Sequence, residues 1–227
     1  MPVQQRGPRA AGGFAATCAL AAGTLYWYKT ERERILRQRI EKSGGKTVGK
    51  ALIGGPFELV DSRDGKTPFS DRDLLGEFSL LYFGFTHCPD ICPDELEKIC
   101  EAANLVERQV GVKVQLVFIT IDPQRDHAKQ VKAYCEEFHP RLIGLTGNEE
   151  AVARACRAYR VYHHRTNDDP KDYLVDHSII TYCLDPQGSF LAFYGKNSTK
   201  EDVAKSLVEL IQAYAKDHPE YTVPKPA

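Results

Sequence analysis

Hydrophobic and polar positions follow a regular order along this chain, and that order predicts alternating strands and helices. Residues 79–85 and 112–121 are apolar runs of the kind that form strands covered on both faces. After each run, apolar residues recur at helical spacing, first from Pro93 onward and then over positions 131–138. The two runs and the helix between them predict a β-α-β unit with parallel strands.

The second half of the pattern predicts a hairpin and a closing helix. Apolar runs and helical spacing indicate a strand at 142–145, a helix at 149–159, strands at 173–184 and 189–194, and a helix at 200–216. Upstream, 57–61 and 65–69 suggest two short strands around a turn at Asp64-Gly65. We therefore predict a thioredoxin-like α/β fold over residues 54–217, with an added N-terminal edge hairpin and a C-terminal tail at 218–227.

A membrane anchor is predicted ahead of this domain. Residues 10–28 form 19 consecutive uncharged residues, enough for a helix to cross a hydrocarbon core of about 30 Å. Tyr26, Trp27 and Tyr28 crowd its end, where aromatic rings favour the headgroup level of a bilayer. We expect a tail at 1–9, a transmembrane helix at 10–28 and a charged, Gly-containing linker at 29–53. A signal or targeting peptide is the alternative.

Composition adds little about partners, but the cysteines are informative. The formal net charge is -1 with 27% charged residues, so no overall basic field indicates nucleic-acid binding. The seven cysteines are an odd number in a chain too long to need disulfide stapling. Of these, only Cys88 and Cys92 are closely spaced, so we expect one special pair, one cysteine in the anchor and four small buried side chains: Cys18 in the anchor, and Cys100, Cys135, Cys156 and Cys183 in the domain.

The closely spaced pair lies at a predicted strand-to-helix junction. Cys88 follows the strand and Cys92 lies at the start of the helix, where unpaired N–H groups favour a thiolate. We expect both sulfurs to be reactive near neutral pH. Three residues separate the cysteines, which suits a metal better than the rapid disulfide exchange of a Cys-x-x-Cys pair. Two thiolates are soft ligands that select Cu(I) or zinc.

Two thiolates leave a metal ion under-coordinated, so a third donor is needed. Among the seven histidines, His177 stands out because it lies in the strand that enters the late hairpin, which we expect beside the cysteine loop. Two cysteines and one histidine suit Cu(I), and a further oxygen or nitrogen donor would accommodate Cu(II). A core histidine is the alternative reading of His177. His163 and His164 adjoin a polar loop, where we expect a surface role.

Several stretches resemble one family of proteins. The run YFGFTHCPDICPDELEK at 82–98 closely resembles the Sco family of mitochondrial and bacterial copper proteins, as do IDPQRD at 121–126, GLTG at 144–147 and YLVDHS at 173–178. The resemblance implies a thioredoxin-like domain, held by one helix, that binds copper for delivery to the dinuclear copper centre of cytochrome c oxidase subunit two. Cys88, Cys92 and His177 are the matching ligand positions.

The resemblance also implies a location and partners. In mitochondrial members the anchor lies in the inner membrane and the domain faces the intermembrane space, whereas a bacterial member would face the periplasm. A second metallochaperone would supply the copper, and a homodimer could form through the anchor.

A thiol-disulfide oxidoreductase is the competing interpretation. Cys88 and Cys92 would then be the catalytic pair, reducing the cysteines of the partner's copper site while His177 is dispensable. A peroxidase is disfavoured, because the activating Arg and Thr arrangement is not evident. The loop at Asp122-Pro123 should lie on the active edge of the sheet, as a docking surface or a tight turn.

Overall fold

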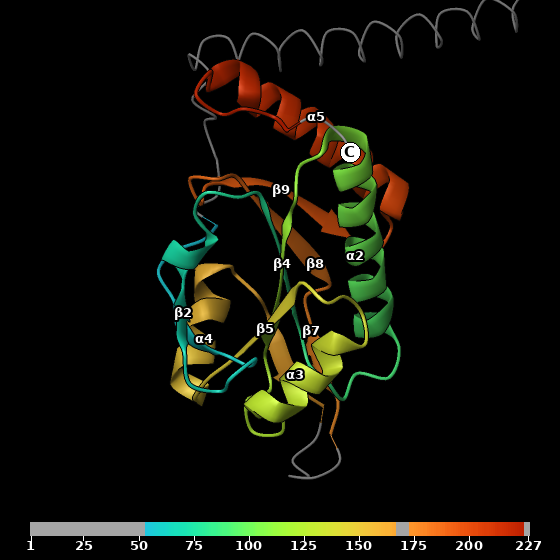
Figure 1. The fold of residues 1–227 in the computed structure, drawn as a ribbon. Coiled ribbons are helices and arrows are strands. Elements are labelled where there is room, and N and C mark those ends of the chain that lie inside the picture. The colour runs from blue at the N-terminus through green and yellow to red at the C-terminus, as the bar shows by residue number, and fades with distance from the viewer. Residues whose placement is uncertain (1–52, 167–172, 225–227) are drawn as a thin grey trace, which may run out of the picture. The chain divides into compact units, whose positions relative to one another are not determined.

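Three of the predicted apolar runs form neighbouring parallel strands at the centre of a seven-stranded sheet (Figure 1). The structure is a computed structural model and describes residues 53–166 and 173–224. Strands β3 (Ser79–Gly84), β4 (Gln115–Thr120) and β5 (Leu142–Thr146) pair in parallel, and nearly every residue in them is buried. Both faces of these strands are covered, which explains why their sequences are apolar without alternation.

Antiparallel hairpins complete the sheet on both sides. Strands β1 (Glu58–Asp61) and β2 (Pro68–Ser70) add the predicted edge hairpin beside β5. On the other side β8 (Ile180–Leu184) pairs with β3, and β9 (Phe190–Gly195) forms the edge. The sheet order is therefore β2-β1-β5-β4-β3-β8-β9, which is the mixed α/β, thioredoxin-like arrangement that the sequence predicts.

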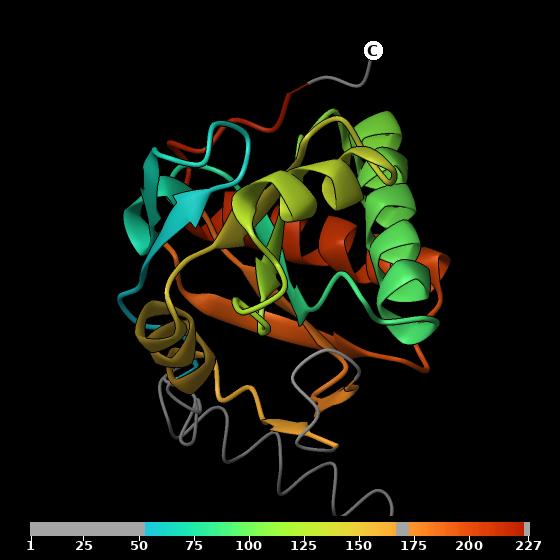
Figure 2. The same cartoon turned by 90° about the horizontal axis from the view of Figure 1, so that it is seen from below.

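The helices cover the two faces of the sheet unequally (Figure 2). Helix α2 (Ile91–Val110) packs against α5 (Lys200–Asp217), and both lie on the same face as α3 (Ala128–Glu136). The opposite face carries α4 (Glu149–Ala158), next to an aromatic cluster of Phe83, Tyr159 and Tyr182. A 3-10 turn, η1 (Asp71–Leu74), begins with a capping box at Ser70 and leads into β3.

Two predicted boundaries are wrong. Helix α2 begins at Ile91 rather than at Pro93, so Cys92 lies inside its first turn. The predicted strand at 173–184 is broken: β7 (Val175–His177) ends before β8 begins, and the two strands belong to different sheets. β7 pairs instead with β6 (His163–Arg165), in a segment that the sequence indicates only as a polar loop. Most residues of β6 and β7 are polar, so the hydrophobic pattern of the sequence does not indicate this two-stranded sheet.

The predicted tail, anchor and linker at 1–9, 10–28 and 29–53 fall almost entirely outside the described residues. Within the described residues, the structure holds no helix that is both long and apolar enough to span a membrane. The anchor therefore stays a prediction. The start of the predicted C-terminal tail is described, and its Tyr221 packs edge-on against Phe78 and Tyr214.

Candidate metal centre

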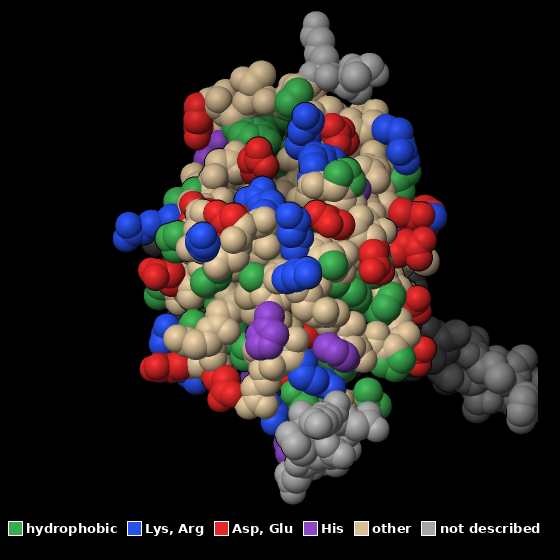
Figure 3. Space-filling view, turned by 60° about the horizontal axis from the view of Figure 1, so that its bottom comes forward, with side chains coloured by type: hydrophobic (Ala, Val, Ile, Leu, Met, Phe, Trp, Pro, Cys, Tyr) green, Lys and Arg blue, Asp and Glu red, His purple; other side chains and the backbone are tan. Residues whose placement is uncertain are grey.

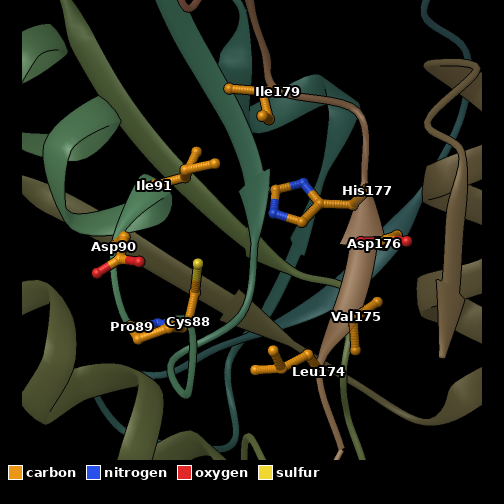
Figure 4. A pocket seen from close by; sticks show the side chains of 9 residues that line it. All are labelled: Cys88, Pro89, Asp90, Ile91, Leu174, Val175, Asp176, His177 and Ile179. Atoms are coloured by element: carbon orange, nitrogen blue, oxygen red, sulfur yellow. The ribbon is translucent and has the colours of Figure 1, made fainter. Parts of the chain in front are cut away.

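The three predicted ligands meet at the carboxyl end of the central strands. Cys88 follows β3, Cys92 occupies the first turn of α2, and His177 is the last residue of β7. Their two sulfurs and an imidazole nitrogen all lie within 4.8 Å of one another. Figure 4 shows the Cys88 sulfur and the His177 ring facing the same small cavity. The group joins residues that are far apart in the sequence but adjacent in the fold.

A buried carboxylate holds the loop that carries Cys88. Asp126 is fully buried and accepts hydrogen bonds from Thr86 N at 2.9 Å and Thr86 Oγ1 at 2.6 Å. It also accepts one from Thr120 Oγ1 at 2.6 Å, at the end of β4. His87 Nδ1 lies 3.3 Å from the same carboxylate. Because its donors come from both the cysteine loop and the end of β4, Asp126 ties this loop to the sheet.

Cys92 is completely buried against β3, and a glycine makes room for it. A Cβ atom at Gly84 would lie only 2.8 Å from Cys92 Sγ, closer than real contacts allow. The Tyr82 hydroxyl, on the same face of the strand, donates a hydrogen bond to Cys92 Sγ at 3.6 Å. The alternation of a strand explains why Tyr82 and Gly84 face one helix together.

The imidazole of His177 is oriented with one nitrogen toward the sulfurs. Its Nδ1 lies 3.0 Å from the Ser178 carbonyl oxygen, and a carbonyl can only accept, so Nδ1 carries the hydrogen. In the neutral ring this leaves the lone pair on Nε2, which lies 3.3 Å from Cys92 Sγ. The rings of Tyr82 and Phe85 pack edge-on against the imidazole. This tautomer is the one that a metal requires of Nε2.

The two cysteines differ sharply in acidity. A hydrogen bond from the Cys92 thiol, with a further bond from the Cys92 backbone N–H, lowers the pKa of Cys88 to about 4. Donating to the Cys88 sulfur and complete burial raise the pKa of Cys92. The expectation that both sulfurs are reactive near neutral pH is therefore wrong for Cys92 in the metal-free protein. Its place inside the helix turn shields it from the solvent that a free thiolate needs.

This asymmetry predicts selective alkylation of the metal-free, reduced protein. Because the pKa of Cys88 is depressed, its thiolate is present above about pH 4 and is lost only as the pH falls through that value. We expect iodoacetamide to modify Cys88 at a rate that changes little between about pH 6 and pH 8, while Cys92 reacts far more slowly. Peptide mapping by mass spectrometry measures both rates. A Cys88 rate that rises about tenfold per pH unit would contradict the assignment.

A cavity of about 230 Å³ opens beside the cysteine loop. Its walls are Cys88, Pro89, Asp90, Ile91 and the segment around His177. Cys88 is partly exposed here, whereas Cys92 lies behind it. Figure 3 views this end of the molecule and shows histidine side chains at the surface, with Lys and Arg side chains gathered nearby. A molecule that enters the cavity from solvent therefore meets Cys88 before Cys92.

The remaining candidates lie apart from this centre. Among the described residues, Cys100, Cys135, Cys156 and Cys183 are free and buried, as expected for small core side chains. His163 and His164 are exposed and lie outside the group of clustered ligand atoms. The Asp122-Pro123 loop lies on the active edge, where Asp122 accepts a hydrogen bond from Tyr173. Sequence reasoning missed the roles of Tyr82, Gly84 and Asp126, although all three fall within the quoted motifs.

The family of this chain follows from a sequence profile that covers most of its length. The sequence profile described as SCO1/SenC matches residues 45–212, well over half of the chain. The chain belongs to the SCO1/SenC family. The family resemblance inferred from the motifs is thereby confirmed.

Individual members of the SCO1/SenC family are similar over most of the chain. The mitochondrial SCO1 homolog 1 of Arabidopsis thaliana is 44% identical over 214 residues, which cover 92% of this chain and 64% of that protein. The mitochondrial SCO1 homolog of Mus musculus is 42% identical over a stretch that covers 89% of this chain and 70% of that protein. The crystal structure of Arabidopsis ScoI with copper bound is 46% identical, with a TM-score of 0.68, and covers 71% of this chain and 99% of that one.

Proposed function

We propose that this protein is a copper metallochaperone. Cys88, Cys92 and His177 hold one copper ion, and the protein delivers it to the dinuclear copper site of cytochrome c oxidase subunit two during oxidase assembly. The observation that carries the proposal is the convergence of two sulfurs and the His177 nitrogen within 4.8 Å of one another. Family membership and the copper bound in the related ScoI structure support copper as the metal.

The chemistry of the donor set favours copper over the commonest competitor. Two thiolates and one neutral imidazole suit three-coordinate Cu(I), whereas structural zinc is almost always bound by four ligands. The clustered group in the described part of the chain consists of three residues. The Nδ1–H of His177 is already directed at a carbonyl, which leaves Nε2 ready to bind without rearrangement. A further oxygen or nitrogen donor would accommodate Cu(II).

The unequal exposure of the ligands supports release to a partner rather than permanent storage. Cys88 borders the open cavity, whereas Cys92 is buried under the helix turn. An incoming thiolate would displace Cys88 first, because copper exchange between thiolates requires direct approach of the new ligand. His177 and Cys92 would hold the ion until the partner's second ligand arrives.

The same proposal includes a place in the cell. Curated relatives are named mitochondrial, which supports the mitochondrial inner membrane as the location. There the predicted helix at 10–28 would anchor the protein, with the copper domain in the intermembrane space. A second metallochaperone would supply the copper, and two chains could pair through their anchors.

A thiol-disulfide oxidoreductase is the second candidate, and the acidity of Cys88 favours it. A thiol with a pKa of about 4 is a thiolate at neutral pH, ready to attack a partner disulfide. Cys88 would form a mixed disulfide, and Cys92 would then attack its sulfur. One partner disulfide is reduced to two thiols, and the Cys88-Cys92 pair is oxidised to a disulfide. This reaction would prepare the partner's cysteines for copper.

Copper titration and transfer test the proposed function. We expect the anaerobically reduced protein to bind one Cu(I) per chain in competition with a Cu(I) chelator. The loaded protein should then transfer copper to the reduced soluble domain of oxidase subunit two, as measured by native mass spectrometry. Cys88→Ser should abolish the tight site, and Cys183→Ser, at a buried strand position apart from the centre, is the matched control. Disulfide reduction without copper binding would leave only the oxidoreductase.

A further inference from the structure

The segment that carries His177 is not part of the main sheet. β7 pairs only with β6 in a separate two-stranded sheet within the described residues, so the ladder of the seven-stranded sheet does not determine its position. His177 must nevertheless place Nε2 beside two sulfurs with an accuracy of a few tenths of an ångström. Other contacts must therefore hold this segment against the domain.

Those contacts centre on Arg125, in the loop between β4 and α3. Its Nε donates to Asp122 Oδ2 at 2.6 Å, and its Nη1 donates to the Tyr173 carbonyl oxygen at 2.9 Å. The Tyr173 hydroxyl returns to the same loop and donates to Asp122 Oδ1 at 2.5 Å. The guanidinium also stacks on the Tyr173 ring, 3.5 Å from its centroid. Two segments far apart in the sequence are thus joined by two hydrogen bonds and a cation–π contact, and the bond from Arg125 to Asp122 braces the loop itself.

These three residues, Asp122, Arg125 and Tyr173, form what we call the arginine clamp. All three side chains are mostly buried, so their hydrogen bonds are little weakened by competition with water. Arg165 adds a second cation, 4.5 Å from the centroid of the Tyr173 ring. Two guanidinium groups therefore contact the Tyr173 ring just ahead of β7. A lysine at position 125 would keep the charge but could not make this forked contact.

The clamp reaches His177 by two routes. Tyr173 precedes His177 by four residues in one extended segment, so fixing the first fixes the path of the second. Phe85 provides the other route: the Arg125 guanidinium lies 5.9 Å from its ring centroid, and the His177 ring packs edge-on against it, also with 5.9 Å between ring centroids. Arg125 and His177 therefore both pack against the Phe85 ring.

We propose that Arg125, with Asp122 and Tyr173, is a positioning group that aligns His177 for copper binding. The inference rests on the proposed function, since it assumes that His177 is a ligand. Arg125 does not touch the three ligand atoms; it acts through the segment that it fastens. Loss of the clamp lets β7 move, and Nε2 is then presented to the metal for only part of the time, which lowers the apparent affinity.

A double-mutant cycle on Cu(I) affinity tests the clamp. We expect Arg125→Lys to weaken Cu(I) binding by roughly 10–100-fold, the usual effect of losing an outer-shell partner. In a His177→Ala background the same substitution should cause little further loss, because the residue it positions is gone. Tyr173→Phe keeps the stacking but loses one hydrogen bond, so its loss should be smaller. In the metal-free protein, the NMR signals of the His177 imidazole should shift in Arg125→Lys.

Controls separate positioning from general stability. Arg141→Lys changes a partly exposed arginine that pairs with Glu107 at the opposite end of β5, and it should leave affinity and the His177 signals unchanged. Additive losses in the cycle, or unchanged affinity in Arg125→Lys while His177→Ala weakens binding, would overturn the clamp alone. Undiminished affinity in His177→Ala would overturn the three-ligand site as well.

Discussion

Replacing His177 with alanine should lower the affinity for Cu(I) by more than about 100-fold, because even outer-shell partners of a metal contribute 10–100-fold. The substitution removes the one nitrogen donor of the clustered group and leaves two sulfurs. Two thiolates alone leave the ion accessible to water and to competing thiols. Competition of the reduced protein with a Cu(I) chelator of known affinity measures the loss.

His163→Ala is the matched control for this substitution. His163 is the direct cross-strand partner of His177 in the two-stranded sheet, but it lies outside the clustered group. The control therefore removes an imidazole from the neighbouring strand without removing a ligand, and Cu(I) affinity should stay within about twofold, as for an ordinary surface substitution. If both variants bind as tightly as the unmodified protein, the three-ligand site is wrong and the oxidoreductase gains support.

Gly84→Ala should damage both the fold and the metal centre. The new Cβ would lie 2.8 Å from Cys92 Sγ, 3.0 Å from Tyr82 and 3.2 Å from Phe118. None of these neighbours is the free end of a long side chain, so the Cys92 sulfur or the first turn of α2 must shift. Overpacking of this kind costs about 1–3 kcal/mol in the free energy of unfolding. We also expect Cu(I) affinity to fall, because the displaced sulfur no longer faces His177.

Gly195→Ala provides the comparison, since Gly195 also ends a strand and a Cβ there would meet nothing within 4 Å. Its unfolding midpoint in urea and its Cu(I) affinity should match those of the unmodified protein. For Gly84→Ala, the two measurements should both change. Unchanged copper affinity in a folded Gly84→Ala protein would show that Cys92 needs no such close approach to β3.

The order and type of the main elements could be predicted because each has a strong local signal. β3 and β4 are buried on both faces, so their sequences are unbroken apolar runs. The start of α2 was misjudged because proline is tolerated throughout the first turn of a helix. The sequence alone therefore does not show whether Pro93 is the first or the third residue of α2. β6 escaped recognition because it is a short, exposed strand with no hydrophobic alternation, and β7 was predicted only as part of one longer strand with β8.

The ligand residues could also be found from the sequence, but their properties could not. Spacing and residue type indicated Cys88 and Cys92, the place of His177 in the predicted fold indicated the third ligand, and the structure brings all three together. The acidity of the two thiols depends on which sulfur accepts a hydrogen bond and which is buried. Neither quantity is local in the sequence. The prediction that both sulfurs are reactive near neutral pH is therefore contradicted for Cys92, whose pKa is raised.

The sequence by itself determined the fold class, the family and the three candidate ligands, because apolar periodicity and a long motif are properties of neighbouring residues. Only the tertiary structure decided the rest. Asp126 holds the Cys88 loop from the loop that follows β4, Gly84 admits the Cys92 sulfur, and Arg125 fastens the segment of His177. The contacts of Asp126 and Arg125 join residues far apart along the chain, and they exist only once the strands have brought the loops to one edge of the sheet.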